Sequence, residues 1–377
     1  MKVAYINSFG GPEQVQFGDM PKPVPAADEI LVRNRIIGVG KPDYLVRSGN
    51  DPYLAKALPG LIIGNESAGI VEEAGPDVKG IKPGDRVAVL NATGCGSHAE
   101  YSCSKEQYAI KLPDGVEPEM VPGILNLQVA YALLFDAGRL GEGDSMYISG
   151  AAGGIGTTMV QMAKASGIRV IASASNEEKC AVLEKLGADT VFNYKEEDEK
   201  EIVLGATNGI GADVIYDQTA GKELAGKFDY LADFGQIILY NWLNGSPELP
   251  QLETIIKCAW HAQAIRSFSF HVYDNKLEKR LANAAKCFDM IRDGSVKPYV
   301  CKAFPLEEAR AAHELLDSGS AIGKIIMHPY KIRTDIIKPT GSRAAGRFLN
   351  HVYCLGVIMV SINGGCSRCS KRQDLYK

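Results

Sequence analysis

The stretch YISGAAGGIGTTMVQMAK, Tyr147–Lys164, decides the fold of this chain. A short apolar run, MYIS, leads into a glycine-rich turn, and TTMVQMAKAS after the turn is typical of a helix. Glycines in such a turn let the backbone approach a diphosphate, whose charge the free N–H groups of the helix then stabilise. The alternative is a plain tight turn between a strand and a helix. A second apolar run at 169–173 completes a β-α-β unit, and this context favours the diphosphate site.

The positions of the G-x-G-x-x-G pattern are taken by alanine, glycine and glycine, so the first glycine of the pattern is replaced. One more glycine inside the turn adds room for a ligand. The sequence therefore predicts that a dinucleotide is bound by one short segment. Its residues are Ala151, Gly153, Gly154, Ile155 and Gly156.

The second predicted strand runs into SASNEEK, 173–179, and this segment bears on the choice of coenzyme. Sites for NAD usually carry Asp or Glu here, which holds the ribose hydroxyls. Ser175 belongs to the residues that replace this acid, and Lys179 follows one helical turn later. A carboxylate would repel a 2′-phosphate, whereas an ammonium group pairs with one. Taken alone, Lys179 is typical of a solvated charge on a helix. Because the acid at the end of the strand is also missing, Lys179 favours NADPH over NADH.

The pattern along the chain predicts an α/β fold. From about residue 121, strand-like runs alternate with helix-like runs, as RVIASA before NEEKCAVLEKLG illustrates. Such alternation is typical of β-α-β units and a parallel sheet. Residues 1–120 differ, because their short apolar runs are separated by Gly, Pro and Asp, as in a compact all-β unit. GKIIMH, 323–328, reads as a returning strand.

Bulk properties exclude several classes of protein. The 46% of hydrophobic residues suffices for sizeable cores, and a net charge of −4 gives no basic field for nucleic acid or a membrane surface. Nine scattered cysteines form no dense framework, which predicts a reducing compartment, the cytoplasm. The first residues resemble no signal peptide, and no run reaches eighteen apolar residues, so no membrane span is expected.

The last segment, residues 330–377, departs from the rest of the chain. It holds nine Lys or Arg against two Asp, a net charge of +7, which leaves −11 for residues 1–329. Its apolar run VYCLGVIMVSI is too short to span a bilayer, and its single C-x-x-C lacks the second half of a zinc site. The segment reads as a basic, poorly ordered tail. A membrane-surface anchor, a partner-binding arm and a gene-model artefact stay open as alternatives.

These motifs together resemble the medium-chain dehydrogenase/reductase superfamily, and within it the zinc-free NADPH:quinone oxidoreductases of the zeta-crystallin-like branch. The resemblance rests on NRIIGVGKPDYLVRSG, GNESAGIVEEAGPDVKGIKPGDRVA, GSHAEYS, SGAAGGIGTTMVQMAK and FPLEEARAAHELLDSGSAIGKIIM. It covers nearly all of residues 1–329. It implies a GroES-like catalytic domain over 1–120, completed by about 300–329, and a Rossmann domain over 121–299. It also implies a homodimer and an active site between the two domains.

The resemblance implies roles for further residues. Lys179 and Tyr194 fall where such reductases hold the 2′-phosphate, although Gly319 stands near the place of an arginine that the family often adds. Asn241 matches an asparagine that contacts the coenzyme, and Val129 falls where relatives place a small polar residue near the nicotinamide.

Zinc dehydrogenases of the superfamily use a Cys near Lys41 and a His in G-H-E, where this chain has Asn65. No cysteine stands at the first position, so a mechanism without metal is expected. Glu66 is expected to be a structural carboxylate. Tyr44 and Tyr53 lie in the segment that faces the cleft by resemblance, and they are the candidates for the proton donor; packing is the alternative for both.

Without a metal, the easier chemistry is hydride transfer from NADPH to an electron-poor acceptor, either a quinone or an α,β-unsaturated carbonyl. A second hypothesis within the superfamily is an enoyl-thioester or prostaglandin-type double-bond reductase. A third is a non-enzymatic NADPH-binding protein with a structural or RNA-binding role, although the acidic core argues against nucleic acid.

Overall fold

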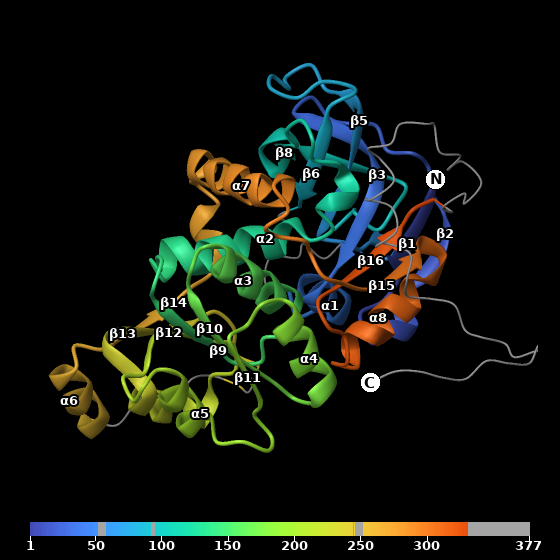
Figure 1. Cartoon of the computed structure of the whole chain (residues 1–377). Helices are drawn as coiled ribbons and strands as arrows, with labels where there is room; N and C mark the ends of the chain where they lie inside the picture. Colours follow the sequence, from blue (N-terminus) through green and yellow to red (C-terminus); the bar gives the residue numbers. More distant parts are fainter. Residues whose placement is uncertain (52–57, 92–94, 244, 246–251, 331–377) are drawn as a thin grey trace, which may run out of the picture. The chain divides into compact units, whose positions relative to one another are not determined.

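The computed structural model describes residues 1–51, 58–91, 95–243, 245 and 252–330. Within these residues, six strands form one parallel sheet in the order β11-β10-β9-β12-β13-β14 (Figure 1). The order reverses on either side of β9, as it does in a doubly wound sheet. The strands are β9 (Ser145–Ile148), β10 (Arg169–Ala174), β11 (Thr190–Asn193), β12 (Ala212–Asp217), β13 (Leu231–Leu239) and β14 (Ala264–Ser267).

Both faces of this sheet are covered, which is why its strands read as continuous apolar runs. Met146 and Ile148 of β9 point into a core shared with α2 and α3, while Tyr147 between them points into a second core with α5. The eight α-helices of the described residues are α1 (Lys41–Ser48), α2 (Ile124–Tyr131), α3 (Gly154–Ala165), α4 (Glu177–Lys185), α5 (Glu199–Ala206), α6 (Leu252–Trp260), α7 (Leu277–Arg292) and α8 (Ala309–Asp317). The predicted Rossmann-type architecture is confirmed.

A second sheet, the β-rich sheet, is mostly antiparallel. Its strands have the order β15-β16-β3-β5-β6-β8, and β7 pairs with β3. Its C-terminal strand β16 lies against β3, where Ile325 pairs with Val39, so the predicted returning strand is present. Three further strands form a small sheet, β2-β1-β4. The strands are β1 (Lys2–Ile6), β2 (Gln16–Asp19), β3 (Glu29–Val39), β4 (Leu61–Ile62), β5 (Glu66–Ala74), β6 (Arg86–Leu90), β7 (Tyr101–Lys105), β8 (Ala109–Lys111), β15 (Val300–Pro305) and β16 (Lys324–His328).

The expectation of an all-β unit over the first 120 residues is wrong in one detail, because α1 lies inside it. The helix begins where Pro42 enters its first turn and the Asp43 carboxylate accepts a hydrogen bond from Gly40 N–H at 2.7 Å. It ends at Gly49, whose φ of 74° is the left-handed conformation that closes many helices. Pro42, Asp43 and Gly49 can be recognised in the sequence as helix signals. The strand-like runs on both sides of them nevertheless led to the prediction of an all-β unit.

The two sheets share buried residues. Ile36 of β3 and Ala88 of β6 belong to the same core cluster as Leu127 of α2. Helix α2 thus packs between the β-rich sheet and α3, and it places its N-terminus close to the glycine-rich turn. The predicted tail lies outside the described residues except for Tyr330, whose ring lies 5.0 Å from the Arg33 guanidinium.

Candidate functional site

The glycine-rich turn connects β9 to α3 at the carboxyl edge of the parallel sheet. Gly150 has a φ of 62°, and Ala151 N–H donates to the Ser173 carbonyl of β10 at 2.8 Å. Gly153 is the N-cap of α3 and makes no side-chain cap, so the first-turn N–H groups are left for a ligand or solvent. The turn therefore has the strand, glycine and helix order that an anion site requires.

The glycines of the turn have different surroundings. A Cβ on Gly156 would stand 2.2 Å from the Ala151 carbonyl oxygen, so only glycine lets the helix pack this closely on the turn. A Cβ on Gly153 would meet no atom within 4 Å. Gly153 is exposed, and Ile155 is half-buried against the core. The turn is thus packed on its inner side and open at Gly153, and this arrangement fits a diphosphate.

The predicted ribose-side residues meet at the ends of β10 and β11. The Lys179 ammonium donates to the Gly319 carbonyl at 2.9 Å and to Ser175 Oγ at 3.3 Å. Its helix, α4, is capped by Asn176, whose side chain accepts from Lys179 N–H. Tyr194 follows β11 and is 45% exposed. A cation, a hydroxyl and a phenol are therefore available in one region, and Gly319 faces Lys179 from the segment after α8.

The other predicted site residues that the structure describes lie in α1, in α2 and just after β13. Val129 is buried in α2 among core side chains. Asn241 follows β13, and its side-chain oxygen accepts from Trp242 N–H at 2.9 Å. Tyr44 lies in α1 with the Lys41 ammonium 3.8 Å from its ring centroid. Tyr53 lies outside the described residues, so the structure does not bear on it.

A buried ion pair that the sequence did not reveal joins two strands of the β-rich sheet and contacts the start of α2. Glu66 of β5 is 3% exposed, and it is paired with Lys324 of β16, which is 5% exposed. The other carboxylate oxygen of Glu66 accepts a hydrogen bond from Leu125 N–H, in the first turn of α2, at 2.8 Å. Glu66 is thus structural, as expected. It holds the start of α2 against the β-rich sheet.

The positions that hold ligands in zinc dehydrogenases form hydrogen bonds within the protein. Asn65 N–H donates to the Asp43 carboxylate at 2.8 Å, and the Asn65 side-chain amide donates to the Asn91 carbonyl at 2.9 Å. Burial raises the pKa of Asp43 to about 7 and lowers the pKa of the neighbouring His98 imidazole to about 3. Among the described residues, no three His, Cys, Asp or Glu side chains are grouped so that they could hold a metal ion.

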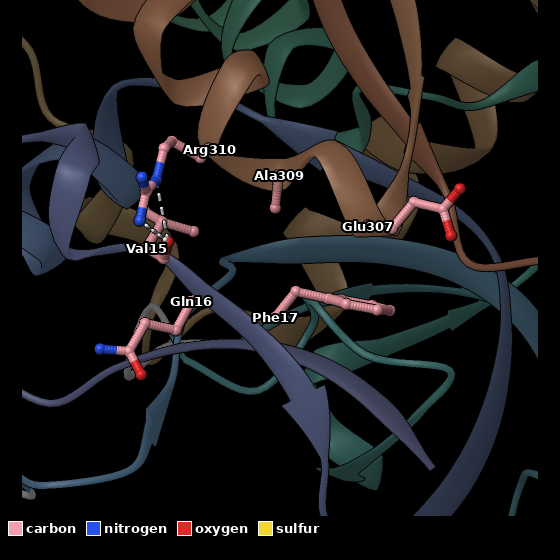
Figure 2. Close-up of a pocket in the computed structure, with 6 residues that line it drawn as sticks. All are labelled: Val15, Gln16, Phe17, Glu307, Ala309 and Arg310. Carbon is pink, nitrogen blue, oxygen red and sulfur yellow. Dashed lines mark hydrogen bonds between the residues drawn. The ribbon is translucent and has the colours of Figure 1, made fainter.

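Two surface pockets lie elsewhere. One, of about 490 Å³, is lined by six residues around β2 and the start of α8, with Arg310 bonded to the Val15 carbonyl across it (Figure 2). The other, of about 770 Å³, is a mainly apolar groove between the β8 segment and α7. Neither pocket is lined by a residue of the glycine-rich turn. In the part of the chain that the structure describes, no helix is long and apolar enough to cross a membrane.

Comparison with known proteins identifies the family. Residues 26–114 match the alcohol dehydrogenase GroES-like domain, and residues 154–283 match the family described as zinc-binding dehydrogenase. The chain is 30% identical to a 2-haloacrylate reductase of a Burkholderia species, over 86% of this chain and 98% of that protein. It is 29% identical to the quinone oxidoreductase of Rattus norvegicus, over 87% of this chain and 97% of that protein.

Solved structures agree with this result. The Escherichia coli quinone oxidoreductase complexed with NADPH superposes with a TM-score of 0.78 at 29% identity, covering 87% of this chain and all of that one. A 2-haloacrylate reductase superposes with a TM-score of 0.76 at 28% identity, covering 87% of this chain and 99% of that one. The chain therefore belongs to the quinone oxidoreductase family of the medium-chain dehydrogenase/reductase superfamily.

Proposed function

We propose that this protein is an NADPH-dependent oxidoreductase that transfers hydride to a quinone or an α,β-unsaturated carbonyl compound. The observation that carries the proposal is the glycine-rich turn, which is open at Gly153 and lies one strand away from the Lys179 ammonium. The relatives named quinone oxidoreductase and 2-haloacrylate reductase support both acceptor classes. When bound, the coenzyme supplies the hydride.

The coenzyme site that we propose uses the predicted residues. The diphosphate lies at the turn from Ala151 to Gly156, where first-turn N–H groups of α3 stabilise its charge. Lys179 leaves the Gly319 carbonyl and pairs with the 2′-phosphate, because an ion pair is stronger than a bond to a neutral carbonyl. Ser175 and Tyr194 add hydroxyl groups. Asn241 contacts the coenzyme, Val129 lies near the nicotinamide, and Tyr44 and Tyr53 stay candidates for the proton donor.

We propose that the reaction needs no metal ion, because Asn65 replaces the histidine ligand and glycine and lysine occupy positions 40–41. The protein's residues then contribute orientation of the two reactants and exclusion of water. The test measures NADPH oxidation with an ortho-quinone, an enone and a 2-haloacrylate, each with and without a chelator. We expect turnover that the chelator does not reduce. Loss of turnover on chelation would refute the metal-free mechanism.

Lys179→Ala is expected to weaken NADPH binding by about tenfold or more and to leave NADH binding within about twofold, because only NADPH carries the 2′-phosphate. Calorimetric titration of both coenzymes measures the effect. Lys185→Ala, an exposed lysine in the last turn of the same helix, is the matched control. Equal losses for NADPH and NADH would exclude the 2′-phosphate role.

The same acceptor panel distinguishes the other two hypotheses. Selective turnover of an enoyl-thioester or a prostaglandin-type enone would indicate the double-bond reductase. NADPH binding without oxidation by any acceptor would indicate a structural or RNA-binding protein.

We also propose a homodimer, as the family resemblance implies, in the cytoplasm. Its support is strand β14, which within the described residues pairs only with β13 and carries the 46% exposed Ile265. Phe234 and Trp260, both 85% exposed, lie next to this edge, since Phe234 N–H donates to the His261 carbonyl. A second copy of the chain would cover these side chains and pair the strand edge. Light scattering should give twice the chain mass of 40.6 kDa; a monomer at micromolar concentration would contradict the proposal.

A further inference from the structure

The Asn126 side chain lies against the start of α3. Asn126 is the third residue of α2, and its Nδ2 is 2.1 Å from the point where a Cβ of Gly154 would stand. Gly154 is the first residue of α3, directly after the open position at Gly153. The missing side chain of Gly154 is therefore what allows an amide from a different helix to reach the glycine-rich turn.

This amide has no hydrogen-bond partner among the described residues, and it is half-buried. Other asparagines that link segments of the fold are bonded. Asn34, for example, donates to the Ala99 carbonyl at 2.9 Å, and Asn176 caps α4. A side-chain amide that forms no hydrogen bond within the protein keeps both of its N–H donors for water or a ligand. Asn126 therefore has N–H groups to offer a ligand that binds at the turn.

The position of Asn126 is fixed before any ligand arrives. Its neighbour Leu125 donates its N–H to Glu66, which is itself paired with Lys324. The first turn of α2 is thus tied to the β-rich sheet, and the amide is held next to the N-terminus of α3. A donor that is held in place loses little conformational freedom when a ligand binds.

We propose that Asn126 binds the diphosphate of the coenzyme by donating a hydrogen bond from its amide to a diphosphate oxygen. This inference rests on the proposed function, because it needs a dinucleotide at the turn. It adds a donor from α2, so that two helices hold the diphosphate. Asn126 determines affinity for ligands that contain the diphosphate, and it leaves recognition of the 2′-phosphate to Lys179.

The test compares three variants by calorimetry with NADPH and with 2′-AMP, which carries the 2′-phosphate but no diphosphate. Asn126→Ala removes the donor and should weaken NADPH binding about tenfold, the usual effect of a lost bond to a charged group. Asn126→Asp has the same size but offers no donor and adds a negative charge, so its loss should be larger. Both should bind 2′-AMP within about twofold of the parent protein. Lys179→Ala should weaken both ligands.

The outcomes separate this inference from the proposed function. Absence of NADPH binding by the folded parent protein would overturn the proposed function and the inference with it. Parent binding that Asn126→Asp leaves unchanged would overturn the inference alone. Equal losses for NADPH and 2′-AMP in both Asn126 variants would show a distorted turn and also overturn the inference. Thermal melting of each variant shows whether it is folded, and Asn126→Ala serves if the aspartate variant is not.

Discussion

Glu66→Leu is expected to lower the free energy of unfolding by about 3–5 kcal/mol, the usual cost of removing one partner of a buried ion pair. The substitution leaves the Lys324 ammonium, which is 5% exposed, without its carboxylate. It also removes the acceptor of Leu125 N–H at the start of α2. Urea unfolding followed by circular dichroism measures the effect.

Two comparisons show whether the burial of the pair causes this loss. Asp289→Asn breaks a pair with Arg292 in which both side chains are half exposed, and it should cost less than about 1 kcal/mol. The double variant Glu66→Leu with Lys324→Met removes both charges, so it should be more stable than Glu66→Leu alone. A Glu66→Leu protein as stable as the Asp289→Asn control would show that the pair does not stabilise the contact between the β-rich sheet and α2.

Gly156→Ala is expected to reduce NADPH affinity by about a hundredfold or more and to lower stability by about 1–3 kcal/mol, the range for overpacked sites. The added Cβ would stand 2.2 Å from the Ala151 carbonyl oxygen and 2.7 Å from the Ala151 Cα. These atoms belong to the backbone and cannot turn away as a flexible side chain can. Helix α3 must therefore move outward, which displaces the N–H groups that we propose bind the diphosphate. Calorimetry with NADPH and urea unfolding measure the two effects.

Gly153→Ala is the matched control in the same turn. Its backbone φ of −77° suits alanine, and its Cβ meets no atom within 4 Å, so its stability should stay within about 0.5 kcal/mol of the parent protein. Its affinity should still fall, since the methyl group enters the open side of the turn, but less than that of Gly156→Ala. Unchanged NADPH affinity in Gly156→Ala would contradict the proposed site.

The sequence predicted the parallel sheet, the glycine-rich turn and the helices that alternate with the strands because each is encoded by neighbouring residues. The first helix after the turn begins at Gly154, three residues earlier than the predicted Thr157, since Gly153 acts as its N-cap. Such boundary differences are small because a helix and its cap are local structures. The approach of Lys179 to Ser175 is local in the same way.

The contacts between distant segments could not be predicted from the sequence. Lys324 is paired with Glu66, which is 258 residues away in the sequence. The Arg47 guanidinium lies 3.3 Å from the Nδ1 atom of His313, which is 266 residues away. In the sequence, Lys324 is an ordinary lysine at the start of an apolar run, and Asn126 is a polar residue in an apolar one. Neither carries a pattern of its own, because a pairing of this kind depends on how the strands and helices meet.

By itself, the sequence determined that the chain has a β-rich part, a doubly wound part and a glycine-rich turn suited to a diphosphate, since periodicity and turn chemistry act over a few residues. Only the tertiary structure decided that Glu66 and Lys324 tie α2 to the β-rich sheet and that Asn126 lies against Gly154. The physical reason is that burial and hydrogen bonding act between atoms that are close in space, and folding brings those atoms together from any distance along the chain.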